Sequence, residues 1–182
     1  MKFFTTALAV FALIATTANG SPMLRMEAEG KKGKSKTEAP VQSPTTKTSS
    51  GCHLTGTYKK GTSIASCSSI VIDSLTVPAG VTLDLSLAKT GATIEFVGTT
   101  TFGTQKWEGP LVRVSGTSLT VKGSGVLDGQ GMWYWKQGQS ITRPVFFKLQ
   151  NVISSTVSGF TIKNMPFRTF SIVTSKDTTL RA

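Results

Sequence analysis

The sequence predicts an all-β protein built as a parallel β-helix, a solenoid of stacked coils. Three observations support this fold. Apolar and polar residues alternate in short bursts, and each burst ends at Gly, Ser, Thr, Asn or Asp, which is typical of short strands separated by turns. A motif recurs, as TVKGSGVLDG over residues 120–129 and as TVSGFTIKN over residues 156–164. The intervals between repeats are unequal, which a solenoid tolerates because insertions leave its coils on one face.

An antiparallel sandwich is the alternative all-β architecture. It would accommodate strands of this length, but it gives no reason for the motif to recur. A further copy strengthens the repeat, because TIEFVG over residues 93–98 lines up with SLTVKG over residues 118–123. The pattern therefore favours the solenoid, with the aromatic segment at 132–135 as an insertion.

The elements follow in chain order, beginning with residues 1–20, which predict a signal peptide. Lys2 is followed by an apolar run over residues 3–14 and then by small residues that end at Gly20. This order is typical of a secretory signal, and the apolar run is too short to span a membrane. We expect cleavage between Gly20 and Ser21, and hence a secreted, extracellular protein that is not held in a membrane.

Residues 21–50 form a second segment of different character. They are rich in Lys, Ser, Thr, Pro and Glu and nearly free of aliphatic residues. Such a composition cannot bury enough apolar surface to offset the entropy lost on ordering. We interpret this segment as a disordered pro-segment or linker.

Residues 51–182 carry the predicted domain, and this domain is basic. Its thirteen Lys and Arg side chains outnumber its six Asp and Glu side chains, which leaves a charge of about +7 of the +11 of the whole chain. A basic surface attracts polyanions. Export favours an acidic polysaccharide over nucleic acid, and no nucleic-acid-binding motif is present.

Within this domain the alternating bursts predict the strands, and the two cysteines predict a local clamp. The best candidate for a helix is the brief segment 62–67. Cys52 and Cys67 are the only cysteines, and an even pair in an exported chain indicates a disulfide. The chain offers too few Cys and His ligands for a zinc site, and we expect neither a metal nor another cofactor. The strand bursts are centred on Leu75 and Val77, Val81 to Leu87, Ile94 and Phe96, Val112 and Val114, Leu119 and Val121, Phe147 and Leu149, Phe160 and Ile162, and Phe170 and Ile172.

Five segments in order resemble secreted endopolygalacturonases of fungi and oomycetes. They are SIVIDSLTVPAGVTLDL, TTTFGTQKWEGPLVRVSG, GVLDGQGMWYW, RPVFFKLQNV and FTIKNMPFRTFSI, and together they cover nearly all of residues 52–180. The resemblance implies a right-handed parallel β-helix with an N-terminal disulfide. It also implies pectin as the substrate and hydrolysis of the α-1,4-galacturonosyl bonds of homogalacturonan with inversion.

The catalytic motifs of that family do not occur in this sequence. Inverting hydrolysis needs one carboxylic acid and one carboxylate roughly 6.5–9.5 Å apart. In the family these come from an Asn-Thr-Asp motif and an Asp-Asp pair, which a Gly-His-Gly and an Arg-Ile-Lys motif complete; none of the four is present. We therefore expect no catalytic residue in this chain and a β-helix that is truncated at its C-terminal end. A truncated product, an incomplete reading of the gene and a degenerate member of the family fit equally well.

Four residues are candidates for contact with the polysaccharide. Aromatic rings stack on sugars, acids accept hydrogen bonds from hydroxyl groups, and cations attract galacturonate. Asp128, the one acid near the aromatic segment, is expected to serve a turn, because Asp side chains hydrogen-bond their own backbone there. The candidates are Lys106, Trp107, Glu108 and Arg143.

Two further readings concern partners. In the first, the chain is a non-catalytic module that binds acidic polysaccharide, or a host inhibitor protein of plant origin, without cleaving a substrate. A β-helix that ends without a cap also exposes unpaired backbone groups and an apolar interior. The polar ending TSKDTTLRA is too short to cover a coil, so we expect self-association through that end.

Overall fold

The computed structural model describes residues 51–181, which belong to one compact unit. The expected signal peptide and pro-segment lie outside the described residues. The described part contains thirteen strands and one short helix. They are β1 (Gly51–Thr57), β2 (Ser69–Val77), β3 (Leu83–Leu85), β4 (Thr93–Val97), β5 (Thr99–Phe102), β6 (Val112–Thr117), β7 (Thr120–Gly123), β8 (Val126–Asp128), α1 (Gly131–Trp135), β9 (Phe147–Ile153), β10 (Thr156–Ser158), β11 (Thr161–Lys163), β12 (Phe170–Val173) and β13 (Thr179–Arg181).

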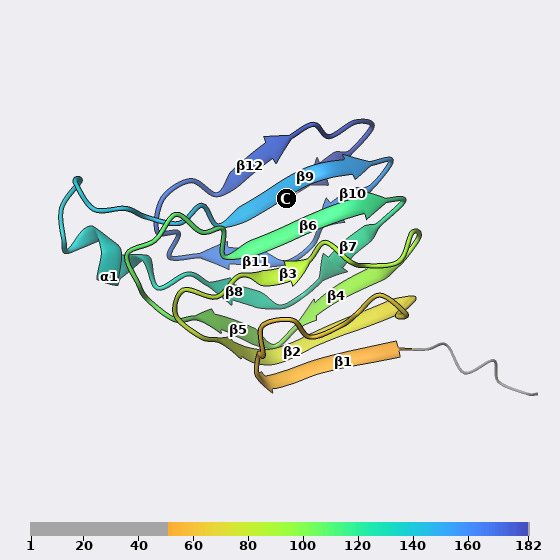
Figure 1. Cartoon of the computed structure of the whole chain (residues 1–182), viewed down its shortest axis with the longest axis horizontal. Helices are drawn as coiled ribbons and strands as arrows, with labels where there is room; N and C mark the ends of the chain where they lie inside the picture. The colour runs from red at the N-terminus through yellow and green to blue at the C-terminus, as the bar shows by residue number, and fades with distance from the viewer. Residues whose placement is uncertain (1–50, 182) are drawn as a thin grey trace, which may run out of the picture. The chain divides into compact units, whose positions relative to one another are not determined.

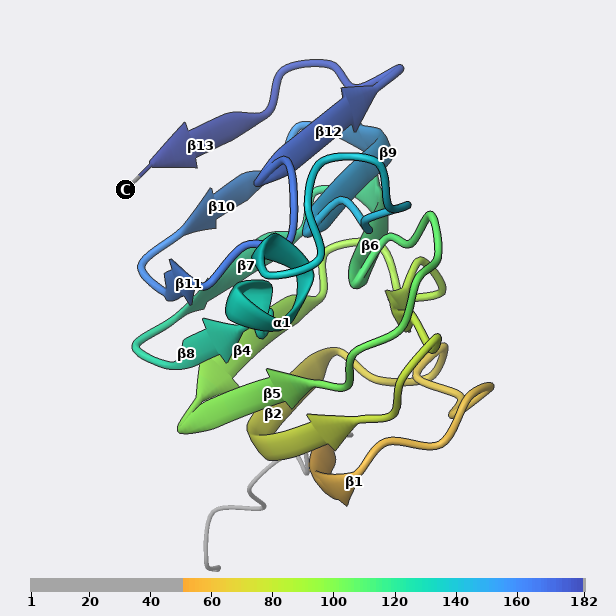
Figure 2. The same ribbon diagram turned by 90° about the vertical axis from the view of Figure 1, so that its left-hand side faces the viewer.

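The strands form two sheets in which every pairing is parallel. The large sheet has the order β11-β8-β5-β2-β4-β7-β10-β13, with β1 also paired to β2, and the small sheet has the order β12-β9-β6-β3. Neighbours within a sheet come from successive coils, and the chain passes from one sheet to the other within each coil (Figures 1 and 2). An antiparallel sandwich is thereby excluded, and the predicted parallel β-helix is confirmed.

The repeat seen in the sequence is real, but one of its alignments is displaced. Thr120 pairs with Thr156, as the recurring motif predicts. Thr93 pairs with Thr120 rather than with Ser118, so the alignment of residues 93–98 with 118–123 is wrong by two residues. Because side chains alternate between the two faces of a strand, a shift of two leaves each residue on the face that was predicted.

The inward-facing residues of both sheets form one apolar core. In β2 and β4 the alternate residues Ile70, Ile72, Ile94 and Phe96 are at most 1% exposed. Phe96 packs edge-on against Phe147, with ring centroids 6.5 Å apart, so the core joins the large sheet to the small one. The bursts of alternation thus mark the residues that hold the coils together.

The N-terminal end is closed by a disulfide without a helix. Cys52 on β1 is bonded to Cys67, whose side chain is fully buried, and their Cα atoms are 5.8 Å apart. The helix expected over residues 62–67 is wrong, because residues 65 and 66 form a turn and the rest of this segment has no regular structure. The only helix of the described residues is α1, which lies in the aromatic segment expected as an insertion.

At the other end, the last described coil presents an apolar surface. Phe170 is 37% and Ile172 is 55% exposed, although both lie in strand β12. A hollow of about 370 Å³ lies beside them, lined by Phe160, Ile162 and Leu180 among others. In the described part of the chain no strand pairs with the outer edges of β12 and β13. No helix of the described residues is long and apolar enough to cross a membrane.

Candidate functional site

The outer face of the small sheet carries a row of charged side chains. In β3, β6 and β9 a charged residue stands between two buried apolar residues, so that the apolar pair points inward and the charged residue outward. Strand register places Asp84 beside Arg113 and Arg113 beside Lys148. Neighbouring strands lie about 4.8 Å apart, so two cations and one carboxylate share a narrow strip of surface.

A polar hollow of about 400 Å³ opens beside this strip. Its lining includes Tyr58, Asp84, Trp107 and Arg113. The Tyr58 hydroxyl accepts a hydrogen bond from the backbone N–H of Asp84 at 3.3 Å. Burial raises the pKa of Tyr58 above its ordinary value; the hydrogen bond from the Asp84 N–H opposes this shift, and the charge of Asp84 adds to it. The hydroxyl therefore keeps its proton and can act as a donor.

Two residues that line this hollow each carry a buried nitrogen without a hydrogen-bond partner. Among the described residues, these nitrogens are Trp107 Nε1 and Arg113 Nε. Arg113 Nη2 donates to Gln150 Oε1 at 3.2 Å, which fixes the guanidinium against the small sheet. Buried donors without partners are uncommon in native proteins, and both belong to side chains at the wall of the hollow, where the nitrogens themselves are covered by protein.

Glu108 lies at a second, smaller hollow on the same side. This hollow is lined by Glu108, Lys148 and Ser171 together with the Gly109–Pro110 turn. Gly109 has a φ of 79°, and a side chain at this position would collide with Pro144. The loop that carries Trp107 and Glu108 is thus packed closely against the chain that leads into β9.

The other two candidate residues stand apart from this strip. Lys106 is exposed on the same loop as Trp107. Arg143 lines a third hollow together with Phe167, outside the row of charged residues on the small sheet. The four residues singled out in the sequence therefore do not form one continuous groove.

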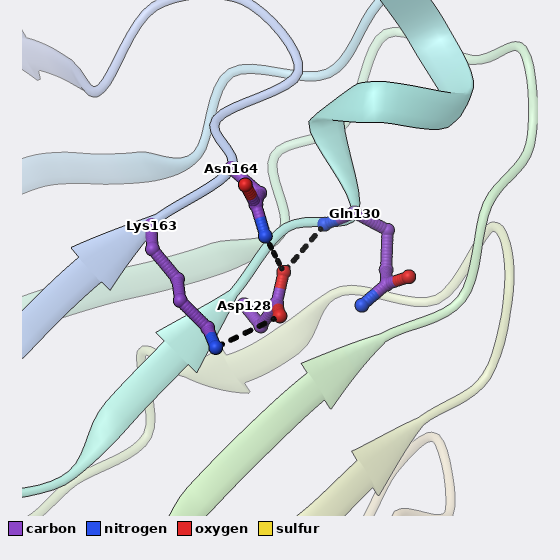
Figure 3. Close-up of polar contacts among 4 residues, drawn as sticks. All are labelled: Asp128, Gln130, Lys163 and Asn164. Atoms are coloured by element: carbon purple, nitrogen blue, oxygen red, sulfur yellow. Dashed lines mark hydrogen bonds and ion pairs between the residues drawn. The ribbon is translucent and has the colours of Figure 1, made fainter.

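Asp128 has the turn role that the sequence predicts. Its Oδ1 accepts hydrogen bonds from the Gln130 N–H at 3.1 Å and from Asn164 Nδ2 at 2.9 Å, while Oδ2 lies 3.4 Å from Lys163 Nζ (Figure 3). Burial alone would raise the pKa of Asp128, but the hydrogen bonds from Asn164 and Gln130 and the contact with Lys163 outweigh it and lower the pKa. The carboxylate stays ionised and engaged, which suits a structural link between two coils.

Four residues of the strip and its hollow were not predicted from the sequence: Tyr58, Asp84, Arg113 and Lys148. Three of them carry a common signal, since each is a charged residue between two apolar residues: Leu-Asp-Leu, Val-Arg-Val and Phe-Lys-Leu. This pattern predicts strands, but it does not show which outward residues of neighbouring strands lie side by side. Tyr58 follows β1 and has no comparable signal.

Comparisons with known proteins show the family of this chain. Residues 67–182 match the family described as glycosyl hydrolases family 28. The chain is 46% identical over 127 residues to a polygalacturonase of Cochliobolus carbonum, a match that covers 67% of this chain and 35% of that protein. It is 45% identical over 129 residues to endopolygalacturonase I of Aspergillus oryzae, covering 68% of this chain and 35% of the relative.

A probable endopolygalacturonase I of Aspergillus terreus is 45% identical over 134 residues, covering 70% of this chain and 36% of the relative. The chain therefore spans about a third of the length of the curated relatives that it matches. The resemblance drawn from the five segments is confirmed, and the chain belongs to glycosyl hydrolases family 28.

Proposed function

We propose that this protein acts on pectin and that its described coils bind homogalacturonan along the outer face of the small sheet. The names of the relatives support the substrate class, since they are polygalacturonases and endopolygalacturonases. The observation that carries the proposal is the pairing of Arg113 with Lys148 beside the polar hollow. A polymer with one carboxylate on each sugar unit matches a strip of neighbouring cations.

The hollow beside the strip suits one unit of such a polymer. Its wall includes the guanidinium of Arg113, the indole of Trp107 and the hydroxyl of Tyr58. A guanidinium binds a carboxylate through two parallel hydrogen bonds. The remaining donors suit the hydroxyl groups of the sugar, and the indole of Trp107 offers an apolar surface to the ring.

We propose further that this chain binds the polymer without hydrolysing it. On the outer face of the small sheet, Asp84 is the single carboxylate among the described strand residues. Asp128 is engaged by Gln130, Asn164 and Lys163. Inverting hydrolysis requires two carboxyl groups on opposite sides of the scissile bond, and the family motifs that would supply them are absent from the sequence.

Binding is tested by affinity electrophoresis of the full chain through gels that contain polygalacturonate. Arg113→Gln and Lys148→Gln should each weaken binding about three- to tenfold, the effect of one charge-assisted contact. Lys122→Gln is the matched control, because Lys122 is exposed on β7 of the large sheet. Equal effects of all three substitutions would mean that only net charge matters, and would overturn the assigned face.

Hydrolysis is tested separately by reducing-sugar release from polygalacturonate. We expect no release above that of a heat-treated sample, because the described strands of the small sheet carry one carboxylate on their outer face and inverting hydrolysis needs two. Steady release would contradict the proposal, and its loss on Asp84→Asn or Glu108→Gln would identify the carboxyl group that is used.

A further inference from the structure

A third hollow lies outside the row of charged residues on the small sheet. It has a volume of about 280 Å³ and is lined by Gln139, Ile141, Thr142, Arg143 and Phe167. Its walls come from the loop between α1 and β9 and from the turn between β11 and β12, at the end of the molecule where α1 projects (Figure 1). None of its lining residues belongs to a strand of the small sheet.

The helix next to this hollow is held firmly in place. Tyr134 of α1 is fully buried, and its hydroxyl accepts a hydrogen bond from the backbone N–H of Gln105 at 3.2 Å. Trp135 Nε1 donates to the carbonyl of Met165 at 3.1 Å, in the turn that leads to Phe167. The loop that lines the hollow thus starts from an anchored helix, and a ligand would lose less entropy there than at a segment without such contacts.

The chemistry of the hollow combines an aromatic ring with a guanidinium. Phe167 is 53% exposed, and the guanidinium of Arg168 lies 5.1 Å from the centre of its ring. Arg143 lines the hollow, and its Nη2 donates to the carbonyl of Gly138, which holds the guanidinium in place. An exposed ring stacks on the apolar face of a sugar, and a guanidinium binds a carboxylate through charge-assisted hydrogen bonds.

We propose that the hollow of Arg143 and Phe167 is a second binding site for an acidic sugar unit, separate from the face of the small sheet. The inference rests on the proposed function, because it assigns the same class of ligand. A polymer that reaches both sites gains affinity through the high effective concentration of its second contact. A long polygalacturonate should then bind more tightly than a short oligomer that fits one site.

The test uses the full chain with three ligands: trigalacturonate, long polygalacturonate and fully methyl-esterified homogalacturonan. Arg143→Gln and Phe167→Ala should each weaken binding of the long acidic polymer about five- to tenfold. Lys136→Gln is the matched control, since Lys136 is an exposed cation on the same segment that does not line the hollow; it should change binding less than twofold. With the esterified polymer, the effect of Arg143→Gln should vanish while that of Phe167→Ala persists.

The possible outcomes separate the two proposals. If the unaltered chain binds no polygalacturonate, the proposed function fails and this inference fails with it. If Arg113→Gln weakens binding but Arg143→Gln and Phe167→Ala behave like Lys136→Gln, only the second site is overturned. Because Phe167 is largely exposed, Phe167→Ala should fold normally, and an unchanged urea midpoint verifies this for every variant.

Discussion

Asp128 offers the sharpest test of how the coils are held together, because its two carboxylate oxygens have different partners. Oδ1 receives both hydrogen bonds, from the Gln130 N–H and from Asn164 Nδ2, while Oδ2 faces only Lys163 (Figure 3). Asp128→Asn keeps an oxygen where Oδ1 stands, removes the charge and places an amide NH2 group where Oδ2 faces Lys163. Asp128→Ala removes the acceptor itself and leaves the two donors without their partner.

The expected costs differ accordingly. A hydrogen bond to a charged group contributes about 1.5–3 kcal/mol, and a part-buried donor left without a partner incurs much of that cost. The Lys163 side chain is half exposed, so its ion pair contributes at most about 1 kcal/mol. We therefore expect Asp128→Ala to lower the free energy of unfolding by about 3 kcal/mol and Asp128→Asn by about 1 kcal/mol or less.

The pH dependence has a definite sign. The pKa of Asp128 is lowered in the folded protein, so its charge adds stability above the ordinary pKa of about 3.9, and this stability is lost as the pH falls through the folded value. The difference between the unaltered chain and Asp128→Asn should therefore be constant at neutral pH and shrink below about pH 4.

Urea unfolding followed by tryptophan fluorescence measures these differences. Lys163→Gln is a useful companion, because it removes the ion pair and leaves both hydrogen bonds in place. If Asp128→Asn and Lys163→Gln destabilise the protein as much as Asp128→Ala does, charge rather than hydrogen bonding holds the coils here, and the reasoning is refuted.

Three further predictions concern the disulfide, the N-terminal segment and the last described coil. Reduction of the Cys52–Cys67 disulfide, which closes a loop with a sequence separation of 15, should lower the free energy of unfolding by about 3 kcal/mol; an unchanged urea midpoint with reductant would contradict this. N-terminal sequencing of exported protein should begin at Ser21 if a signal peptide is removed, or further along if the segment 21–50 is also removed, whereas a start at Met1 would contradict export by this route. We also propose that the chain self-associates through the exposed apolar side chains of the last described coil. Sedimentation should then show dimers or larger species, and Ile172→Lys should convert them to monomer. A monomer at all concentrations of the unaltered chain would contradict this proposal.

The sequence was sufficient to predict the fold because one physical constraint repeats in every coil. Inward residues must be apolar and must alternate with outward polar residues, so the bursts at Ile94 and Phe96 or at Val112 and Val114 could be recognised one by one. The failures have equally local causes. The segment 62–67 has no alternation that would exclude a helix, but it is irregular, with a turn at residues 65 and 66 beside the disulfide. Residues 131–135 form a single short helix, which their glycine and aromatic residues do not indicate.

The site was harder to predict because its residues become neighbours through strand register, although they lie far apart in the sequence. Arg113 and Lys148 are adjacent on neighbouring strands but are separated in the chain by α1 and its loop. An error of two residues in aligning coils leaves the predicted core unchanged, since the same side chains still point inward. The same error moves each outward charge opposite a different partner, so a row of cations across the sheet can be recognised only when the true pairing is known. The loop residues Trp107 and Glu108 could be named as candidates because their motif is distinctive, whereas the charged strand residues of the strip could be recognised only from the structure.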